Sequence, residues 1–388
     1  MDRRHDLDWL RILLFALLVP HHAAVGFVGF GRDIYGFVND ELGGPLLALG
    51  IYFSHSWRLP SLFFIAGVGT YFATSRGIGA RFLGSRLARL LVPALFGTFV
   101  LNVGYGYAIA VVRGEAPPFL AFWRDWLLAP EPRQVGHLWF LYNLAFYTLA
   151  CWPLYALRGR LERTRLAAPR LLAALIGAVT LVVVAAMPFG KALAGDGYQL
   201  PWYLAIFAAG YVIGARHRDV LDWAARRAFA LLGAAAAVFA VLVIVLARAY
   251  ARDPALGAAL AEGGWAPAGL AAAFTAETIL SSTLKGVNAW LWCLAATGLV
   301  ARYLNRDGTL LRALRPAVFP VYVLHFPVTI IGLALLLAVP WPWQAKFVVL
   351  TLAVYAVTWA LYRLAARGGR LVYLVGGKPA RVARQRPA

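Results

Sequence analysis

The chain alternates long apolar segments with short polar segments rich in arginine along its whole length. Most apolar segments approach the roughly 20 residues that an α-helix needs to cross a bilayer. Continuous apolar runs of this length predict membrane helices rather than strands or surface helices. We predict ten spans, at residues 7–30, 46–74, 85–112, 137–157, 170–188, 199–215, 228–249, 284–304, 317–338 and 344–364. The pattern therefore predicts an all-α polytopic membrane protein with about ten transmembrane helices in one bundle.

Residues 250–283 interrupt this pattern between the seventh and eighth spans. The stretch "GLAAAFTAETILSSTL" at 269–284 is too polar for a membrane span, so we predict an outer loop with an interfacial helix there. No repeat of fixed period, Gly/Ser linker or low-complexity block divides the chain. We therefore predict one transmembrane domain over residues 1–366, followed by a basic cytoplasmic tail over residues 367–388.

Composition agrees with a membrane protein, since 62% of the residues are hydrophobic and only 14% are charged. A soluble chain is about half apolar and a quarter charged. The net charge of +20 would suggest nucleic-acid binding on a soluble domain, but no segment here is long enough to form one. We therefore expect no nucleic-acid partner.

The basic residues gather on one side of the predicted membrane. With the N-terminus inside, 26 arginine and lysine residues fall in the inner segments and six in the outer ones. The positive-inside rule explains this asymmetry and predicts that both termini are cytoplasmic. Anionic membrane lipids are then the expected partners of most of these arginines. The six outer residues are Arg32, Arg113, Arg124, Arg133, Lys191 and Arg252.

Polar residues interrupt the first span, which we expect to be a retained helix rather than a cleaved signal peptide. Arg11 and His22 are eleven positions apart, which places them on one helical face about 16 Å apart along the axis. His21 is rotated about 80° from that face. Asp8 lies three residues before Arg11 and can neutralise it, and Pro20 is expected to kink the helix. Ionisable groups at membrane depth mark function or internal pairing, although both histidines could also be interfacial residues that are simply hydrogen-bonded.

The second span contains "SHSWRLPSLFFIAG", with His55 and Arg58 one turn apart. Arg58 lies about 20 Å beyond the start of the span at Pro45, which is too deep for its guanidinium to reach the membrane surface easily. Its side chain must therefore face the bundle interior or water. A structural ion pair and a ligand contact both remain open.

The third span opens with "SRLARLLVP", which places Arg86 and Arg89 on one face at the inner end of the helix. Two arginines at this spacing can hold a phosphate through several charge-assisted hydrogen bonds. Anchoring at the inner membrane surface explains the same spacing, so both interpretations stay open.

Two further spans carry clustered polar and aromatic residues. In the ninth, "FPVYVLHFPV" places Tyr322 and His325 on one face between two prolines. At the outer edge of the fourth, "HLWFLYNLAFY" begins with His137 and Trp139. The two cysteines, Cys151 and Cys293, lie inside apolar runs, so the sequence predicts neither a disulfide framework nor a metal site.

These landmarks together resemble the acyltransferase 3 family of integral membrane acyltransferases over nearly the whole chain. The resemblance rests on "LDWLR" with a histidine eleven residues after its arginine, on the Arg-x-x-Arg pair, and on "FFIAG", "HLWFL" and "YVLH" in that order. "DLDWLRILLF", "RLPSLFFIAG" and "HLWFL" are most similar to the branch of periplasmic glucan succinyltransferases, the glucan biosynthesis protein C type. One small departure is Ala66-Gly67-Val68, where the family has Ser-Gly-Phe.

The resemblance implies an enzyme of the bacterial inner membrane that moves an acyl group, such as acetyl or succinyl, from cytoplasmic acyl-CoA to a hydroxyl of an extracytoplasmic glycan or glycolipid. Arg86, Arg89 and Arg11 would hold the CoA phosphates, and we add Arg58 to this donor-binding set. Acyl-CoA is then a co-substrate, and no metal is expected.

The same resemblance implies that His22 removes the proton of the acceptor hydroxyl as a general base, or accepts the acyl group as a nucleophile. Tyr322 and His325 would line the channel and polarise the thioester carbonyl. His137, Trp139 and His55 are the candidate acceptor-binding residues. Outer tryptophans, among them Trp123 and Trp126, could stack on a sugar or form an interfacial belt.

Two other classes of protein remain open. A proton-coupled transporter of a small polar substrate also places histidine, arginine and aspartate at membrane depth, but it often contains inverted repeats, and none is visible here. A non-catalytic lipid-binding or scaffold function would account for the basic loops but would leave the buried residues Arg58, His22 and His325 unexplained.

Overall fold

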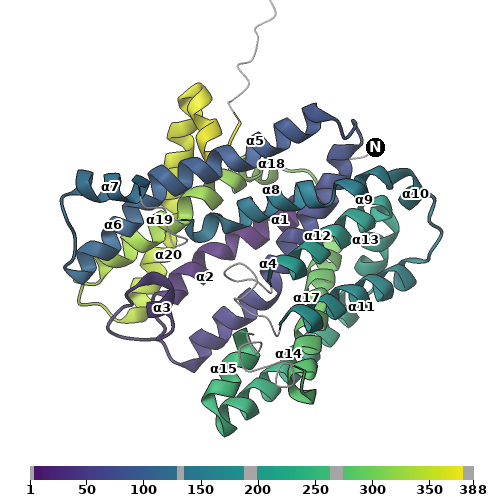
Figure 1. Cartoon of the computed structure of the whole chain (residues 1–388), viewed down its shortest axis with the longest axis horizontal. Coiled ribbons are helices and arrows are strands. Elements are labelled where there is room, and N and C mark those ends of the chain that lie inside the picture. Colours follow the sequence, from purple (N-terminus) through teal and green to yellow (C-terminus); the bar gives the residue numbers. More distant parts are fainter. Residues whose placement is uncertain (1–3, 129–134, 188–198, 263–273, 379–388) are drawn as a thin grey trace, which may run out of the picture. The chain divides into compact units, whose positions relative to one another are not determined.

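The computed structural model describes residues 4–128, 135–187, 199–262 and 274–378. Within these ranges the regular elements are all helices and no strand occurs, which confirms the predicted all-α class (Figure 1). The main helices are α1 His5–Ala16, α2 Leu18–Val25, α3 Gly31–Tyr35, α4 Pro45–Thr74, α5 Ala80–Phe96, α6 Asn102–Arg113, α7 Phe119–Leu128, α8 Trp139–Ala150, α9 Trp152–Ala156, α10 Arg158–Arg163, α11 Ala168–Ala186, α12 Gln199–Ala215, α13 His217–Arg226, α14 Ala228–Arg252, α15 Pro254–Glu262, α17 Ala276–Tyr303, α18 Thr309–Leu314, α19 Val318–Leu336 and α20 Trp343–Arg367. Three further elements are the π-helix η1 Gly97–Leu101 and the 3₁₀ helices η3 Gly136–Leu138 and η6 Gly369–Val375.

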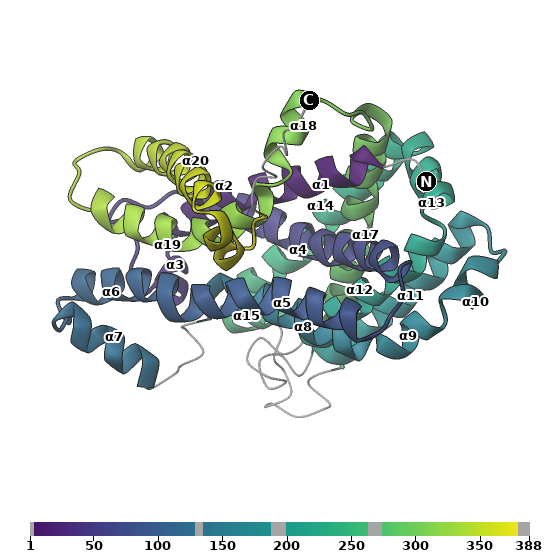
Figure 2. The same ribbon diagram turned by 90° about the horizontal axis from the view of Figure 1, so that it is seen from above.

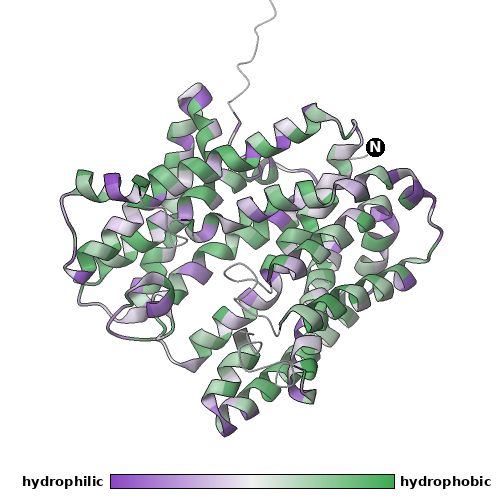
Figure 3. Cartoon of the chain, viewed as in Figure 1, coloured by the Kyte–Doolittle hydropathy of each residue, from purple (hydrophilic) through white to green (hydrophobic). Residues whose placement is uncertain are grey.

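Among the described residues, seven helical segments are long and apolar enough to cross a membrane. The protein is therefore a multi-pass membrane protein, and hydrophobic residues cover most of these helices in Figure 3. The remaining three predicted spans coincide with α4, α12 and the α8–α9 region. That all ten cross the membrane stays a prediction. The seven segments are His5–Val25, Ala80–Arg113, Ala168–Ala186, Ala228–Arg252, Ala276–Tyr303, Val318–Leu336 and Trp343–Arg367.

The prediction of an outer loop over residues 250–283 is wrong for its last part, residues 276–283, which are helical. Helix α17 already begins at Ala276, and the Thr275 side chain caps it by accepting a hydrogen bond from the Thr278 backbone N–H at 3.3 Å. The short helix α15 follows α14 directly. Residues 263–273 of the predicted loop lie outside the described part of the chain.

The chain divides into two compact units, each assembled from separate stretches of sequence. Unit 1 consists of residues 1–14, 53–82 and 147–307, and unit 2 consists of residues 15–52, 83–146 and 308–388. In unit 1, α17 packs against α11, α13 and α14. In unit 2, α19 packs against α2, α6 and α20, and α19 and α20 run side by side in Figure 2.

A proline breaks the first predicted span, as expected. Helix α1 ends at Ala16 and α2 begins at Leu18. Pro20 has no N–H, and its ring clashes with the carbonyl four residues earlier, so the Ala16 carbonyl has no partner within the helix. In unit 2 the Tyr355 hydroxyl donates a hydrogen bond to this carbonyl at 2.5 Å. The interrupted helix is thereby held against α20.

A π-helix interrupts the long span Ala80–Arg113 at η1. A π-helix displaces the regular backbone hydrogen bonds and leaves carbonyls available to other donors. The Trp126 indole N–H donates to the Thr98 carbonyl at 2.9 Å, and that of Trp123 donates to the Phe99 carbonyl at 3.1 Å. The π-helix therefore fixes the position of α7.

Candidate active site

Three histidines from distant parts of the sequence meet in unit 2. His22 lies on α2, His137 on η3 and His325 on α19. The ring centroids of His22 and His325 are 5.2 Å apart, and those of His137 and His325 are 4.9 Å apart. Phe326 contacts His22 and His137, with its ring centroid 5.1 Å from that of His22 and 5.0 Å from that of His137. We call these three residues the histidine cluster.

The hydrogen bonds of Tyr35 determine which ring nitrogen of neutral His22 carries the proton. The Tyr35 hydroxyl donates to the His22 backbone carbonyl at 2.7 Å, and its oxygen lies 3.1 Å from His22 Nδ1. A hydroxyl has one proton, so the oxygen that donates to the carbonyl can only accept from the ring. The neutral His22 ring therefore carries its proton on Nδ1, and Nε2 is its basic nitrogen.

The same reasoning assigns the other two rings. His325 Nδ1 lies 2.6 Å from the Tyr322 carbonyl, and His137 Nε2 lies 3.1 Å from the Val323 carbonyl. Carbonyls only accept, so each of these nitrogens carries a proton in the neutral ring. Pro327 explains why the Val323 carbonyl is available, because a proline removes the helical N–H four residues beyond it.

Accessibility separates His22 from the rest of the cluster. His325 is fully buried at 0% exposure and His137 is 6% exposed, whereas His22 is only partly buried. His21 is also partly buried, and its ring lies 5.3 Å from that of His22. Of the clustered rings, His22 is thus the one best placed to meet a substrate.

Backbone geometry and two hydrogen bonds position His137. Gly136 adopts a left-handed conformation with φ of +49°, which a side chain would disfavour. The Asn102 side-chain amide donates to the Val135 carbonyl at 3.2 Å. The Tyr322 hydroxyl donates to the His137 carbonyl at 2.6 Å. The proton of Tyr322 is therefore used to hold the backbone of η3 in this arrangement.

Two of the four predicted donor-binding arginines, Arg86 and Arg89, lie on α5 in unit 2. Arg89 places its guanidinium 5.9 Å from the centre of the Phe319 ring at the start of α19. Phe319 in turn contacts Tyr322, with centroids 6.1 Å apart. Arg86 is partly buried one turn earlier on the same helix. A series of contacts therefore runs from Arg89 through Phe319 and Tyr322 to the histidine cluster.

Three other predicted site residues, Arg11, His55 and Arg58, belong to unit 1. Arg11 pairs with Asp8 at 3.9 Å, as its spacing predicts. Arg58 is buried at 1% exposure, and it interacts electrostatically with His55. Lys285 on α17 interacts with His55 as well, and its Nζ donates to the Ala261 carbonyl at 2.5 Å.

Sequence reasoning missed Lys285, Tyr35 and Phe326. Lys285 stands at the edge of the span predicted to begin at residue 284, where a lysine needs no special explanation. Because α17 begins at Ala276, Lys285 in fact lies more than two turns inside the helix. Trp139, predicted to bind acceptor, begins α8 and is partly buried, with its ring 6.5 Å from that of Phe140.

Across residues 4–128, 135–187, 199–262 and 274–378, no group of three histidine, cysteine, aspartate or glutamate side chains is arranged to hold a metal ion. That the reaction uses no metal stays an expectation. The proton positions of the histidine cluster are set by Tyr35, Tyr322 and Val323.

The fold and this cluster define a multi-pass membrane protein with a histidine-centred polar site inside one of its two units. Residues 4–363 match the model of the acyltransferase 3 family, described as an acyltransferase domain, and the chain belongs to that family. It is therefore an enzyme, an acyltransferase. No curated protein and no solved structure matches the chain.

Proposed function

We propose that the protein is an O-acyltransferase that moves an acyl group from cytoplasmic acyl-CoA to a hydroxyl of an extracytoplasmic carbohydrate or glycoconjugate. The observation that carries this proposal is the Tyr35 and His22 arrangement, which leaves Nε2 of a partly accessible histidine as a base. A hydroxyl is a weak nucleophile at neutral pH, and an imidazole near neutrality is suited to remove its proton.

The reaction then balances as follows. Nε2 of His22 takes the acceptor proton while the hydroxyl oxygen attacks the thioester carbonyl carbon. The C–S bond breaks, the CoA thiolate takes the proton from the His22 imidazolium, and an ester and free CoA result. In the alternative route Nε2 attacks the thioester carbonyl carbon, the C–S bond breaks and CoA leaves as its thiolate. The acceptor hydroxyl then attacks the acyl-imidazole, the N–C bond breaks, and the hydroxyl proton passes to the thiolate through solvent. Both routes use the same nitrogen.

We assign Tyr322 and His325 to positioning rather than to direct polarisation of the thioester carbonyl. The Tyr322 proton is donated to the His137 carbonyl, and the His325 proton is donated to the Tyr322 carbonyl. The His325 ring contacts that of His22. The two residues therefore support the cluster around the base.

Arg86 and Arg89 are proposed to bind the CoA phosphates at the inner end of α5. The Arg89 guanidinium lies over the Phe319 ring at a cation–π distance, which leaves its N–H groups able to donate to a phosphate. With this assignment we propose that both termini are cytoplasmic and that the protein lies in the bacterial inner membrane. Arg11, Arg58 and His55 remain proposed contacts for donor or acceptor.

The acyl group and acceptor are proposed from the sequence resemblance to periplasmic glucan succinyltransferases. Family membership favours transfer over the proton-coupled transporter. The test uses purified protein in lipid vesicles with radiolabelled succinyl-CoA or acetyl-CoA and glucan acceptors. Label appearing in the glycan together with free CoA supports the proposal. Uptake of substrate into vesicles without any ester formation would contradict it.

A further inference from the structure

Lys346 is a buried cation of unit 2 that binds neutral acceptors. It lies in the first turn of α20 and is 5% exposed. Its Nζ donates to Asn39 Oδ1 at 2.8 Å and to the Leu337 carbonyl at 3.5 Å. No ion pair within the described ranges involves this ammonium group. Burying a charge without a counter-charge is unfavourable, so stability alone does not explain the contact to Asn39.

The contact of Lys346 reaches a segment that is bonded to the helix of His22. Asn39 belongs to residues 36–44, which follow α3 and which we call the α3 loop. The backbone N–H of Asn39 donates to the Gly26 carbonyl at 2.9 Å. Gly26 caps the C-terminus of α2, four residues after His22. Lys346 therefore connects α20 to a loop that is held against the end of α2.

Arg113 on α6 holds the other end of the α3 loop. Its Nε and Nη2 both donate to the Gly36 carbonyl, each at 3.3 Å. Gly36 directly follows Tyr35, has φ of +79°, and donates its N–H to the Arg32 carbonyl at 2.8 Å. A glycine in this left-handed conformation ends a helix. The backbone next to Tyr35 is thereby bonded to α6.

The predicted topology gives neither cation a reason to be where it is. Arg113 is one of the six basic residues on the predicted outer side, where the positive-inside rule disfavours them. Lys346 lies at the predicted outer end of the last span. Both cations bind the loop that follows Tyr35, and the Tyr35 hydroxyl in turn makes two hydrogen bonds with His22.

We propose that Lys346 and Arg113 are positioning residues for acyl transfer, because they hold the α3 loop so that the Tyr35 hydroxyl stays on Nδ1 of His22. This inference rests on the proposed role of His22 as the base. Each cation binds loop atoms and acts through Tyr35. When either contact is lost, α3 can shift and the His22 ring also adopts the tautomer with its proton on Nε2. That tautomer cannot accept the hydroxyl proton at Nε2.

The kinetic test is a double-mutant cycle between Lys346→Met and Tyr35→Phe, measured as turnover of acyl-CoA by the protein in nanodiscs. Lys346→Met alone should lower turnover about tenfold, because the base is misoriented, and leave the KM for acyl-CoA within about twofold. In the Tyr35→Phe background it should cause less than about a twofold further loss, since its connection to His22 is already removed. Losses that multiply would assign Lys346 to stability alone and overturn the proposal.

Lys285→Met is the matched control for the lysine. Lys285 is another buried lysine, 7% exposed, and it belongs to unit 1. Whatever loss of turnover this variant causes should be the same with and without Tyr35→Phe. Coupling of equal size at Lys285 and Lys346 would show a general effect of buried lysines, and the proposal would fail.

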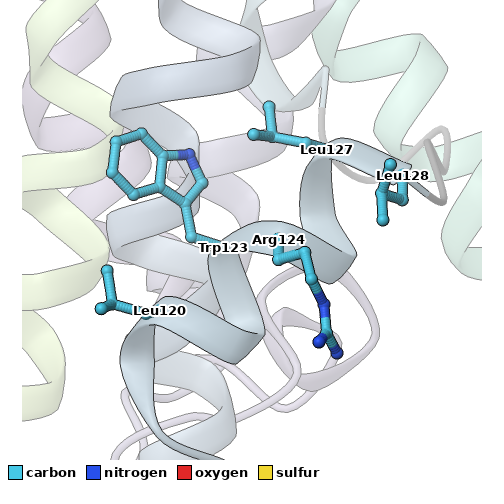
Figure 4. Close-up of a pocket in the computed structure, with 5 residues that line it drawn as sticks. All are labelled: Leu120, Trp123, Arg124, Leu127 and Leu128. Carbon is cyan, nitrogen blue, oxygen red and sulfur yellow. The ribbon is translucent and has the colours of Figure 1, made fainter.

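Arg113→Ala tests the loop from an exposed position, where a substitution seldom prevents folding. It should lower turnover in the same direction as Lys346→Met and show the same coupling to Tyr35→Phe. The matched control is Arg124→Ala, since Arg124 is another exposed outer arginine and lines a surface hollow on α7 (Figure 4). This control should keep full turnover. Full turnover in Arg113→Ala as well would remove Arg113 from the proposed role.

A second measurement does not depend on catalysis. Nitrogen NMR of protein with isotope-labelled histidine reports which ring nitrogen carries the proton, and the spectrum of His22→Ala assigns the His22 signals. Neutral His22 should be protonated on Nδ1, whereas Lys346→Met should give a mixture of both tautomers. An unchanged tautomer in Lys346→Met and Arg113→Ala overturns the positioning role. If the tautomer changes while no acceptor yields an ester, the proposed transfer has failed and the positioning role has not.

Discussion

The Tyr35 hydroxyl makes two hydrogen bonds with His22: it donates to the His22 backbone carbonyl at 2.7 Å and accepts from Nδ1 of the ring at 3.1 Å. This arrangement fixes both the rotation of the imidazole and the nitrogen that carries its proton. A residue in the short helix α3 thereby orients the base on α2. The proposed chemistry depends on this contact.

Replacing Tyr35 by Phe removes the hydroxyl and keeps the ring that contacts Phe326 at 5.6 Å. The turnover number should fall about 10- to 100-fold, because misorientation of the base removes part of the contribution of general base catalysis. The KM for acyl-CoA should stay within twofold. Steady-state kinetics with varied acyl-CoA measures both.

Tyr105→Phe is the matched control for Tyr35→Phe, since Tyr105 contacts the same Phe326 ring at 5.3 Å from α6. This variant should retain most of its turnover. Equal losses in the two variants would indicate a general disturbance of packing rather than loss of the contact to His22.

A separate prediction concerns the binding of the acyl-CoA donor by Arg86 and Arg89 on α5. Arg86→Ala and Arg89→Ala should each raise the KM for acyl-CoA about tenfold, since a charge-assisted hydrogen bond contributes roughly 1.5–3 kcal/mol. Lysine at either position should recover only part of the affinity, because an ammonium group cannot bind two oxygens in one plane.

The control for the arginine pair is Arg81→Ala, at an exposed position near the start of the same helix. It should leave the KM for acyl-CoA unchanged. Unaltered affinity in the Arg86→Ala/Arg89→Ala double variant would instead assign both residues to anchoring at the inner membrane surface.

The asymmetry of basic residues predicts the topology. Reporter fusions after residue 258, in α15, should give an outer signal, and fusions after residue 384 should give an inner one. Alkaline phosphatase and green fluorescent protein fusions in a bacterial host measure the two locations. An inner signal after residue 258 would contradict the count of ten spans.

The positions of most membrane helices could be predicted from hydropathy alone, and the start of α17 shows where this fails. Thr278, Ser281 and Ser282 made the segment too polar for a span, yet all three are buried in the bundle. Thr278 and Ser281 satisfy their hydroxyls on carbonyls three residues earlier in sequence, as hydroxyls in membrane helices commonly do. Hydropathy scales count such groups as exposed and therefore underestimate the span.

The site was predicted in part. Tyr322, His325, His137 and His22 were each selected, and the structure brings them together. Tyr35 was missed because it lies in a loop helix of five residues, where no periodicity indicates a distant partner. Helical periodicity orders residues on one helix and gives no information about contacts between helices.

The division into two units could not be predicted either. Each unit combines stretches from the beginning, middle and end of the chain, so no change of composition marks a boundary. Arg11 and Arg58 belong to unit 1 and His22 to unit 2 for this reason, although the sequence pattern suggested a single set.

The most direct test of His22 as the catalytic base compares His22→Ala with His21→Ala in the rate of acyl transfer from acyl-CoA. Both histidines are partly buried neighbours on α2, so loss of folding or of one imidazole affects both variants alike. His22→Ala should still insert and bind acyl-CoA but lose about 10²- to 10⁴-fold in turnover, whereas His21→Ala should retain most of it. If His21→Ala abolishes transfer and His22→Ala does not, His22 is not the base and the proposed mechanism is wrong.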